Sequence, residues 1–85
     1  MDMVELHLKH LAAQAAVEKR TRIVENHRAR LLKLTQLGAS ESILRNMRGL
    51  IMAADERREL AEENLAKVEK KLCELTKEVK PHELT

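Results

Sequence analysis

The chain has 85 residues, of which 35% are charged and none is aromatic, and its formal net charge is +2. A chain this short forms at most one small domain, and its abundance of Ala, Leu, Glu, Lys and Arg is typical of long helices or a coiled coil. The apolar runs fall short of the ~20 residues that span a bilayer, so we expect no membrane span. The single cysteine excludes an internal disulfide framework and fits a cytoplasmic compartment.

The first predicted element is a helix over about residues 2–37. Apolar residues recur along one side of it at helical spacing, and Arg20 and His27 interrupt the series. We expect this side to face a second helix, because a helix buries a single apolar stripe against its neighbour. The stripe consists of Leu6, Ala13, Val17, Val24, Leu31 and Leu34.

The beginning of the same helix carries a second apolar stripe, on nearly the opposite side. It consists of Val4, Leu8, Leu11 and Ala15 and is called the outer stripe below. One partner helix cannot cover both sides of a helix. The outer stripe therefore predicts either a copy of this chain, which would complete a four-helix bundle, or a helical segment of a different protein.

A turn is predicted at residues 38–40. Gly38 follows Leu37, and glycine is the usual residue just past a helix end, where the backbone becomes left-handed. Ser40 and Ser42 are candidate N-caps for a second helix, and Glu41 would lie in its first turn, where the helix dipole favours negative charge.

The second predicted helix spans about residues 41–79 and ends before Pro81, because proline disfavours helical geometry in the preceding residue. From Leu44 to Val79 it carries a seam in strict a/d heptad spacing, with Arg58 as its one polar member. Such a seam persists only where another helix packs along it. Its expected core residues are Met47, Ile51, Ala54, Ala61, Leu65, Val68, Leu72 and Leu75.

Two helices of similar length and a short loop predict an all-α fold, an antiparallel two-helix hairpin in which residues 1–85 form a single domain with a C-terminal tail at 81–85.

Arg58 allows two interpretations. A polar seam residue either fixes the register of the helix pair or lays its aliphatic stem over the seam and keeps its charge in water.

The basic residues concentrate around the predicted turn. Residues 19–48 contain eight lysines and arginines against two glutamates. The chain has no aromatic residue to stack on bases and is nearly neutral overall, which argues against nucleic-acid binding. The residues at issue, called the basic turn region, are Arg28, Arg30, Lys33, Arg45 and Arg48.

No pattern of an enzyme is present. The chain lacks a glycine-rich phosphate loop and a nucleophile elbow. His7 and His10 share a helical face, but two ligands are too few for a structural zinc site, and Cys73 is their only thiol neighbour in the expected hairpin. We expect no catalytic residue, no metal and no cofactor.

The length, the long first helix, the turn Leu37-Gly38-Ala39-Ser40-Glu41-Ser42 and the amphipathic second helix resemble the small E-type (YscE-type) chaperones of bacterial type III secretion, over residues 10–75. The resemblance implies a cytoplasmic helical hairpin that, with a larger tetratricopeptide-like co-chaperone, keeps a self-polymerising needle subunit soluble. The co-chaperone would then bind an apolar helical face, either the outer stripe or the flank of the second helix.

Two alternatives from other functional classes stay open. Glu25-Asn26 echoes part of the pattern of the HR1 modules of Rho effectors, which are antiparallel coiled-coil fingers. That resemblance implies contact between the basic turn region and the switch regions of a small GTPase. The other alternative is a purely structural homodimeric bundle without a further partner.

Overall fold

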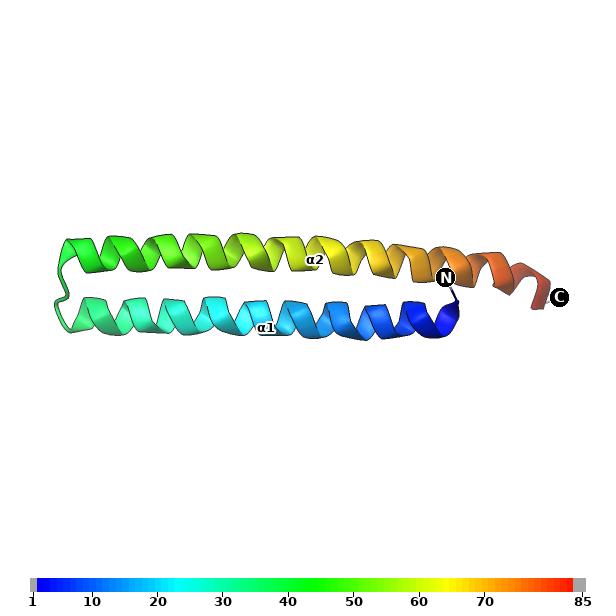
Figure 1. The fold of residues 1–85 in the computed structure, drawn as a ribbon, viewed down its shortest axis with the longest axis horizontal. Coiled ribbons are helices and arrows are strands. Elements are labelled where there is room, and N and C mark those ends of the chain that lie inside the picture. Colours follow the sequence, from blue (N-terminus) through cyan, green and yellow to red (C-terminus); the bar gives the residue numbers. More distant parts are fainter. Residues whose placement is uncertain (1, 84–85) are drawn as a thin grey trace.

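The computed structural model describes the backbone of residues 2–83 and the side chains of residues 2–76. Two antiparallel helices, α1 (Met3–Gln36) and α2 (Glu41–Glu83), pack side by side along a molecule with a longest dimension of 67 Å (Figure 1). The predicted all-α helical hairpin is confirmed. Because α2 is the longer helix, it continues past the beginning of α1 at the open end of the hairpin.

Helix α1 begins at a cap that the sequence supplies locally. Asp2 is extended, and its carboxylate accepts a hydrogen bond of 2.8 Å from the backbone N–H of Glu5. This bond satisfies one of the backbone donors that the first turn leaves without a partner. Glu5 itself adds a negative charge at the positive end of the helix dipole.

The turn between the helices depends on the left-handed backbone of Gly38, whose φ is 76°. The N–H of Gly38 donates to the carbonyl oxygen of Thr35, and the N–H of Ala39 donates to that of Leu34. These two bonds form a Schellman motif, which closes the last turn of α1. Ser40 is the N-cap of α2, since its hydroxyl accepts from the N–H of Ile43 at 3.4 Å.

The predicted end of α2 at residue 79, with a tail from Pro81, is wrong. The helix continues through Pro81 and ends at Glu83. A proline close to the end of a helix removes one backbone hydrogen bond, and its φ of about −65° is itself helical. The rest of the predicted tail, residues 84–85, lies outside the described residues.

The seam of α2 faces α1 along its described length. Every seam side chain from Leu44 to Leu75 is buried or half-buried, including Arg58, whereas Val79 lies outside the described side chains. Of the inward stripe of α1 and the expected core residues of α2, six are buried, namely Leu6, Ala13, Val24, Met47, Ala54 and Val68. The other eight are half-buried, namely Val17, Leu31, Leu34, Ile51, Ala61, Leu65, Leu72 and Leu75.

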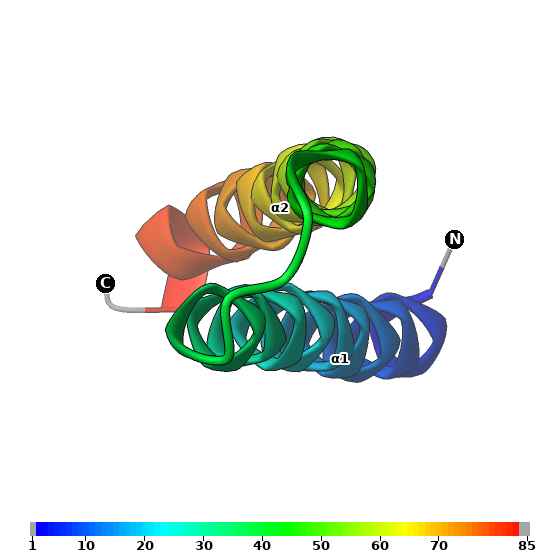
Figure 2. The ribbon, with the colours of Figure 1, turned by 90° about the vertical axis from the view of Figure 1, so that its left-hand side faces the viewer.

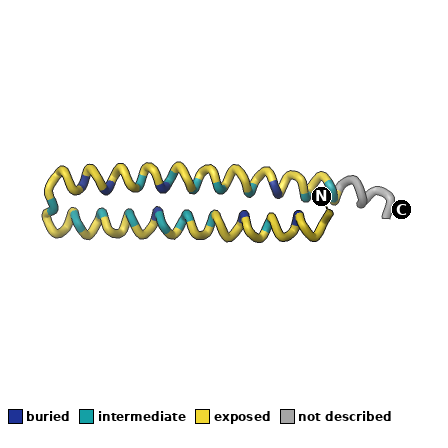
Figure 3. The backbone as a smooth tube through the Cα atoms, in the orientation of Figure 1, coloured by how far each residue is buried: buried dark blue, intermediate teal, exposed yellow. Residues whose placement is uncertain are grey.

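Helix α1 supplies a matching seam that is more regular than the sequence indicates. Its buried and half-buried side chains include an unbroken heptad series from Leu6 to Leu34, in which His10, Arg20 and His27 occupy seam positions. The sequence does not predict that His10 lies in the seam, because its spacing groups His10 with His7 on one helical face. Figure 3 shows the buried positions of both helices along their facing sides.

The hairpin therefore has one layer of contact between two helices. Viewed along the long axis, their axes are inclined to each other, and no third element covers either helix (Figure 2). A helix can bury only one side in such a pair. Apolar residues on the remaining sides stay in water.

The methionines of α2 provide a matched test of the seam. Met47 is 7% exposed and Met52 is 67% exposed. We expect Met47→Ala to lower the free energy of unfolding by about 2–5 kcal/mol, because it leaves a cavity in the seam. Met52→Ala should change it by less than about 0.5 kcal/mol. Urea unfolding followed by circular dichroism measures both, and equal losses would contradict the seam.

The two glycines provide a test in which one substitution has opposite effects. Gly38→Ala should destabilise the hairpin by about 1–2 kcal/mol, because alanine is strained at positive φ. Gly49 lies inside α2, and a Cβ added there meets no atom within 4 Å. Gly49→Ala should therefore stabilise by up to about 1 kcal/mol through helix propensity. Thermal unfolding of the two variants and the wild type measures both effects. A loss of stability for Gly49→Ala would contradict the finding that the space around Gly49 is open.

Candidate functional site

The outer stripe lies on the side of α1 that faces away from α2. Val4, Leu8 and Leu11 are 69%, 61% and 61% exposed, and Ala15 is exposed as well. These residues recur at alternating spacings of four and three, which is the spacing of the seam itself. A second helix could therefore pack against the outer stripe by the same knobs-into-holes geometry that holds α2 on the opposite side.

The register of the seam also defines the two long edges of the hairpin. In a heptad, positions e and g flank the a and d positions, and in an antiparallel pair the g positions of both helices share one edge. We assign Leu44 of α2 and His10 of α1 to heptad position a. The g positions between residues 9 and 71 then hold five apolar residues, four cations and no carboxylate. This apolar-basic edge comprises Lys9, Ala16, Ile23, Arg30, Leu37, Ile43, Leu50, Arg57, Asn64 and Lys71.

The opposite edge, called the polar edge, has the reverse character. Its α2 side carries the carboxylates of Glu41, Asp55, Glu62 and Glu69. Arg48 pairs with Glu41 at 3.0 Å on this edge. All of the ion pairs found among residues 2–76 have at least one partner here.

Arg58 reaches the polar edge from its seam position. Its guanidinium pairs with Asp55 at 2.8 Å and with Glu62 at 2.6 Å, both on its own helix. The hydrogen bond to Asp55 and the attraction of both carboxylates raise the pKa of Arg58 above its usual value, against the opposing effect of desolvation. Because its partners lie on α2, this geometry favours the interpretation in which the stem covers the seam and the charge points outward.

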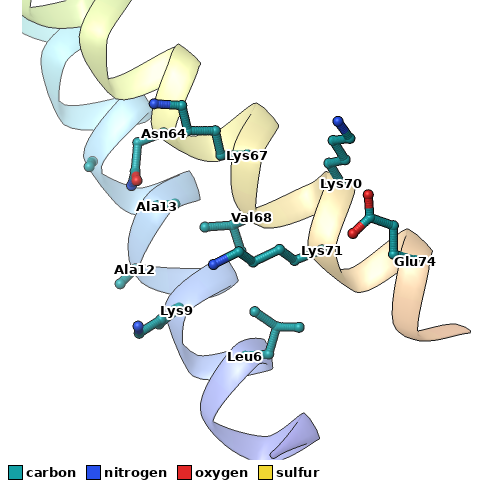
Figure 4. Close-up of a pocket in the computed structure, with 11 residues that line it drawn as sticks. Leu6, Lys9, Ala12, Ala13, Asn64, Lys67, Val68, Lys70, Lys71 and Glu74 are labelled. Carbon is teal, nitrogen blue, oxygen red and sulfur yellow. The ribbon is translucent and has the colours of Figure 1, made fainter. Parts of the chain in front are cut away.

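A groove opens on the apolar-basic edge towards the open end of the hairpin, with a volume of about 690 Å³. Its floor is apolar, because short alanine side chains of α1 leave space beside Leu6 and Val68 (Figure 4). Four lysines and one glutamate surround this floor. The floor consists of Leu6, Ala12, Ala13, Ala16 and Val68, and the surround of Lys9, Asn64, Lys67, Lys70, Lys71 and Glu74.

The sequence indicates neither the groove nor its lysines as a site. The signal that finds them is the absence of carboxylates from the g positions between residues 9 and 71, and its α1 half becomes visible only after the α1 register is known. Figure 4 shows that Lys71 extends from α2 towards α1, whereas Lys70 and Glu74 point to the outer side of α2. The flank of the second helix, which the resemblance suggests as one possible binding face, corresponds to two edges in the structure. One edge is apolar and basic, and the other is polar and carries carboxylates.

The basic turn region is exposed but does not form one patch. Arg28 and Arg48 occupy e positions on the polar edge, where Arg48 is paired with Glu41. Arg30 occupies a g position on the other edge, and Lys33 and Arg45 lie further from the seam. The fold thus distributes these cations around the hairpin.

His10 is the least satisfied polar side chain. Its Nε2 atom is buried and has no hydrogen-bond partner. Glu69 Oε2 lies 3.5 Å away without the geometry of a hydrogen bond. His7 and Cys73 are exposed, and among the described residues no three His, Cys, Asp or Glu side chains are grouped so that they could hold a metal ion.

Searches against protein families, curated proteins and solved structures find no match to this chain. Neither helix, over the part that the structure describes, has a stretch long and apolar enough to cross a membrane. The surfaces themselves are therefore the basis for any functional conclusion.

Replacing His10 tests the cost of its unpartnered nitrogen. We expect His10→Leu to stabilise the hairpin by about 1–3 kcal/mol, because leucine removes a buried polar atom and fills an a position. His7→Leu, at an exposed position three residues away, is the matched control and should change stability by less than about 0.5 kcal/mol. Thermal unfolding measures both changes. Destabilisation by His10→Leu would mean that the imidazole contributes an interaction that the seam needs.

Proposed function

We propose that this chain is a non-enzymatic helical interaction module that holds a helix of another protein against its outer stripe. The observation that carries the proposal is the exposure of Val4, Leu8 and Leu11 on one face of α1. Contiguous apolar surface on a small protein commonly marks an interaction site. Covering a valine or leucine stabilises a complex by about 1.5–3 kcal/mol per side chain before the costs of association.

The spacing of the outer stripe supports a helix as the partner. Residues at i, i+4 and i+7 are the anchors used when an amphipathic helix docks on a complementary surface. Ala15 extends the series by one further step and offers room for a close approach of the partner backbone. An extended peptide or a small molecule would not require this repeat.

Among helical partners, we favour a co-chaperone or a secreted subunit in the cytoplasm, as in the E-type chaperones that the chain resembles. The hairpin and its Gly38 turn agree with that resemblance. The alternative of a GTPase-binding finger receives less support, because the cations near the turn are distributed around the hairpin. A homodimer through the outer stripe remains the principal competitor.

Charged residues on the outer stripe test the proposal. Leu8→Asp combined with Leu11→Asp should abolish partner capture while helicity is retained, because both side chains are exposed in the hairpin. Met52→Asp with Leu60→Asp, two exposed residues of α2, is the matched control and should leave capture unchanged. Circular dichroism and affinity capture from a lysate with mass spectrometry provide the measurements.

Each result has a definite meaning. Capture of a tetratricopeptide-like protein with a small helical subunit, lost in the outer-stripe variant, supports the co-chaperone function. A stable dimer by light scattering that captures nothing and dissociates in the variant makes the outer stripe a homodimer contact and rejects the proposal. A collapse of helicity in the variant would place the outer stripe in the intramolecular core and also reject it.

A further inference from the structure

We propose that the apolar-basic edge is a second docking site, distinct from the outer stripe, whose occupant is an acidic amphipathic helix of a partner protein. Its apolar face would lie in the groove over Leu6, Ala13 and Val68, with glutamates and aspartates along its sides. The inference does not depend on the outer stripe or on the resemblance to a chaperone. It rests on the distribution of charge, the shape of the groove and the heptad spacing of the edge.

The lysines of the groove have no ion-pair partner among the side chains that the structure describes. Lys9, Lys67 and Lys71 take part in none of the ion pairs found among residues 2–76, all of which involve the polar edge. Glu74 is the one carboxylate that lines the groove, beside four lysines, and it takes part in none of these ion pairs. A set of unpaired cations around an apolar floor is complementary to an anionic, partly apolar ligand.

The apolar surface continues beyond the groove along the same edge. Leu37, Ile43 and Leu50 are exposed near the turn, and Ile23 is half-buried between them and the groove. These residues occupy g positions on two antiparallel helices, so they follow the heptad repeat in both directions. A third helix laid along the edge would meet apolar residues near the turn, both apolar residues and arginines in the middle, and lysines at the open end.

The groove favours an acidic helix over three other possible occupants: a second copy of this chain, a membrane surface and a nucleic acid. A second copy docked by two-fold symmetry would place this cationic edge against itself, which opposes association. A flat membrane surface could contact the exposed Leu37, Ile43 and Leu50 but not Leu6, Ala13 and Val68, which are buried at the bottom of the groove. The chain has no aromatic residue with which to stack nucleic-acid bases.

The two components of the site have separate roles. The small exposed alanines at positions 12 and 16 let a partner helix approach closely, and covering them together with the exposed Leu37, Ile43 and Leu50 provides affinity. The lysines favour acidic over basic partners and accelerate encounter, so their effect weakens as salt screens the charges. Binding at this site should therefore be selective for charge and sensitive to ionic strength.

Designed peptides test the inference directly. Two fluorescent helical peptides would share one leucine heptad stripe, with glutamates beside the stripe in one and lysines in the other. Titrated with the full chain and followed by anisotropy, the glutamate peptide should bind at least about tenfold more tightly. Its affinity should fall as salt is raised. Equal binding of the two peptides, or binding of neither, would overturn the proposal.

Charge reversal places the binding on this edge. Lys67→Glu with Lys71→Glu should reverse the preference between the peptides, while Arg22→Glu with Arg45→Glu makes the same change in net charge at exposed positions elsewhere and should not. Loss in both variants would indicate only bulk charge and reject the site. Leu8→Asp with Leu11→Asp should leave peptide binding intact, so failure here is distinguishable from failure of the outer stripe.

Other occupants would be revealed by the same variants. Self-association of the wild type that Lys67→Glu with Lys71→Glu abolishes would identify a second copy as the occupant. Binding to phosphatidylserine vesicles with that sensitivity, without peptide binding, would identify a membrane surface. Either result overturns the proposal of an acidic helix.

Discussion

The packing of two heptad seams against each other is the constraint on which the rest of this molecule depends. Gly38 reverses the chain, and the seams of α1 and α2 then bury their a and d positions over the length of α1. This contact covers one side of each helix and no more. The outer stripe, the apolar-basic edge and the polar edge therefore remain exposed to solvent. The packing of the two helices does not constrain these surfaces, so they are available for function.

The seam also sorts the charges of the chain. Along its edges, the register places Glu41, Asp55, Glu62 and Glu69 at e positions of α2, whereas the g positions of α2 between residues 43 and 71 hold aliphatic residues, cations and Asn64. Polar seam members follow this division. Arg58 extends to the carboxylates of the polar edge, and His10 lies beside Glu69 on the same side. The polar edge thereby holds the ion pairs found among the described residues, and the apolar-basic edge retains lysines outside these pairs together with exposed apolar residues.

The hairpin thus offers two surfaces of different chemistry for two helices. The outer stripe is apolar and would bind through buried area, whereas the apolar-basic edge would discriminate by charge. A small module that holds two segments at once could bring a partner and its client together without catalysis. This combination agrees with the proposed role as a helical interaction module, and it arises from one seam that leaves both surfaces uncovered.

The sequence alone determined the hairpin, because heptad spacing in α2, the stripe of α1 and a glycine between them are local signals that agree with one another. It also located the outer stripe, since helical periodicity places Val4 and Leu8 on a common face without knowledge of the fold. Tertiary structure decided what depends on pairing. The position of His10 in the seam and the groove beside Val68 require the register between the helices, and alanines and polar residues in α1 obscure that register. The ion pairs of Arg58, in contrast, are local, because Asp55 and Glu62 lie three and four residues away on the same helix. The end of α2 also differed, because the helix continues through Pro81 to Glu83: the φ of proline is compatible with a helix, although proline lacks the N–H that would donate one backbone hydrogen bond.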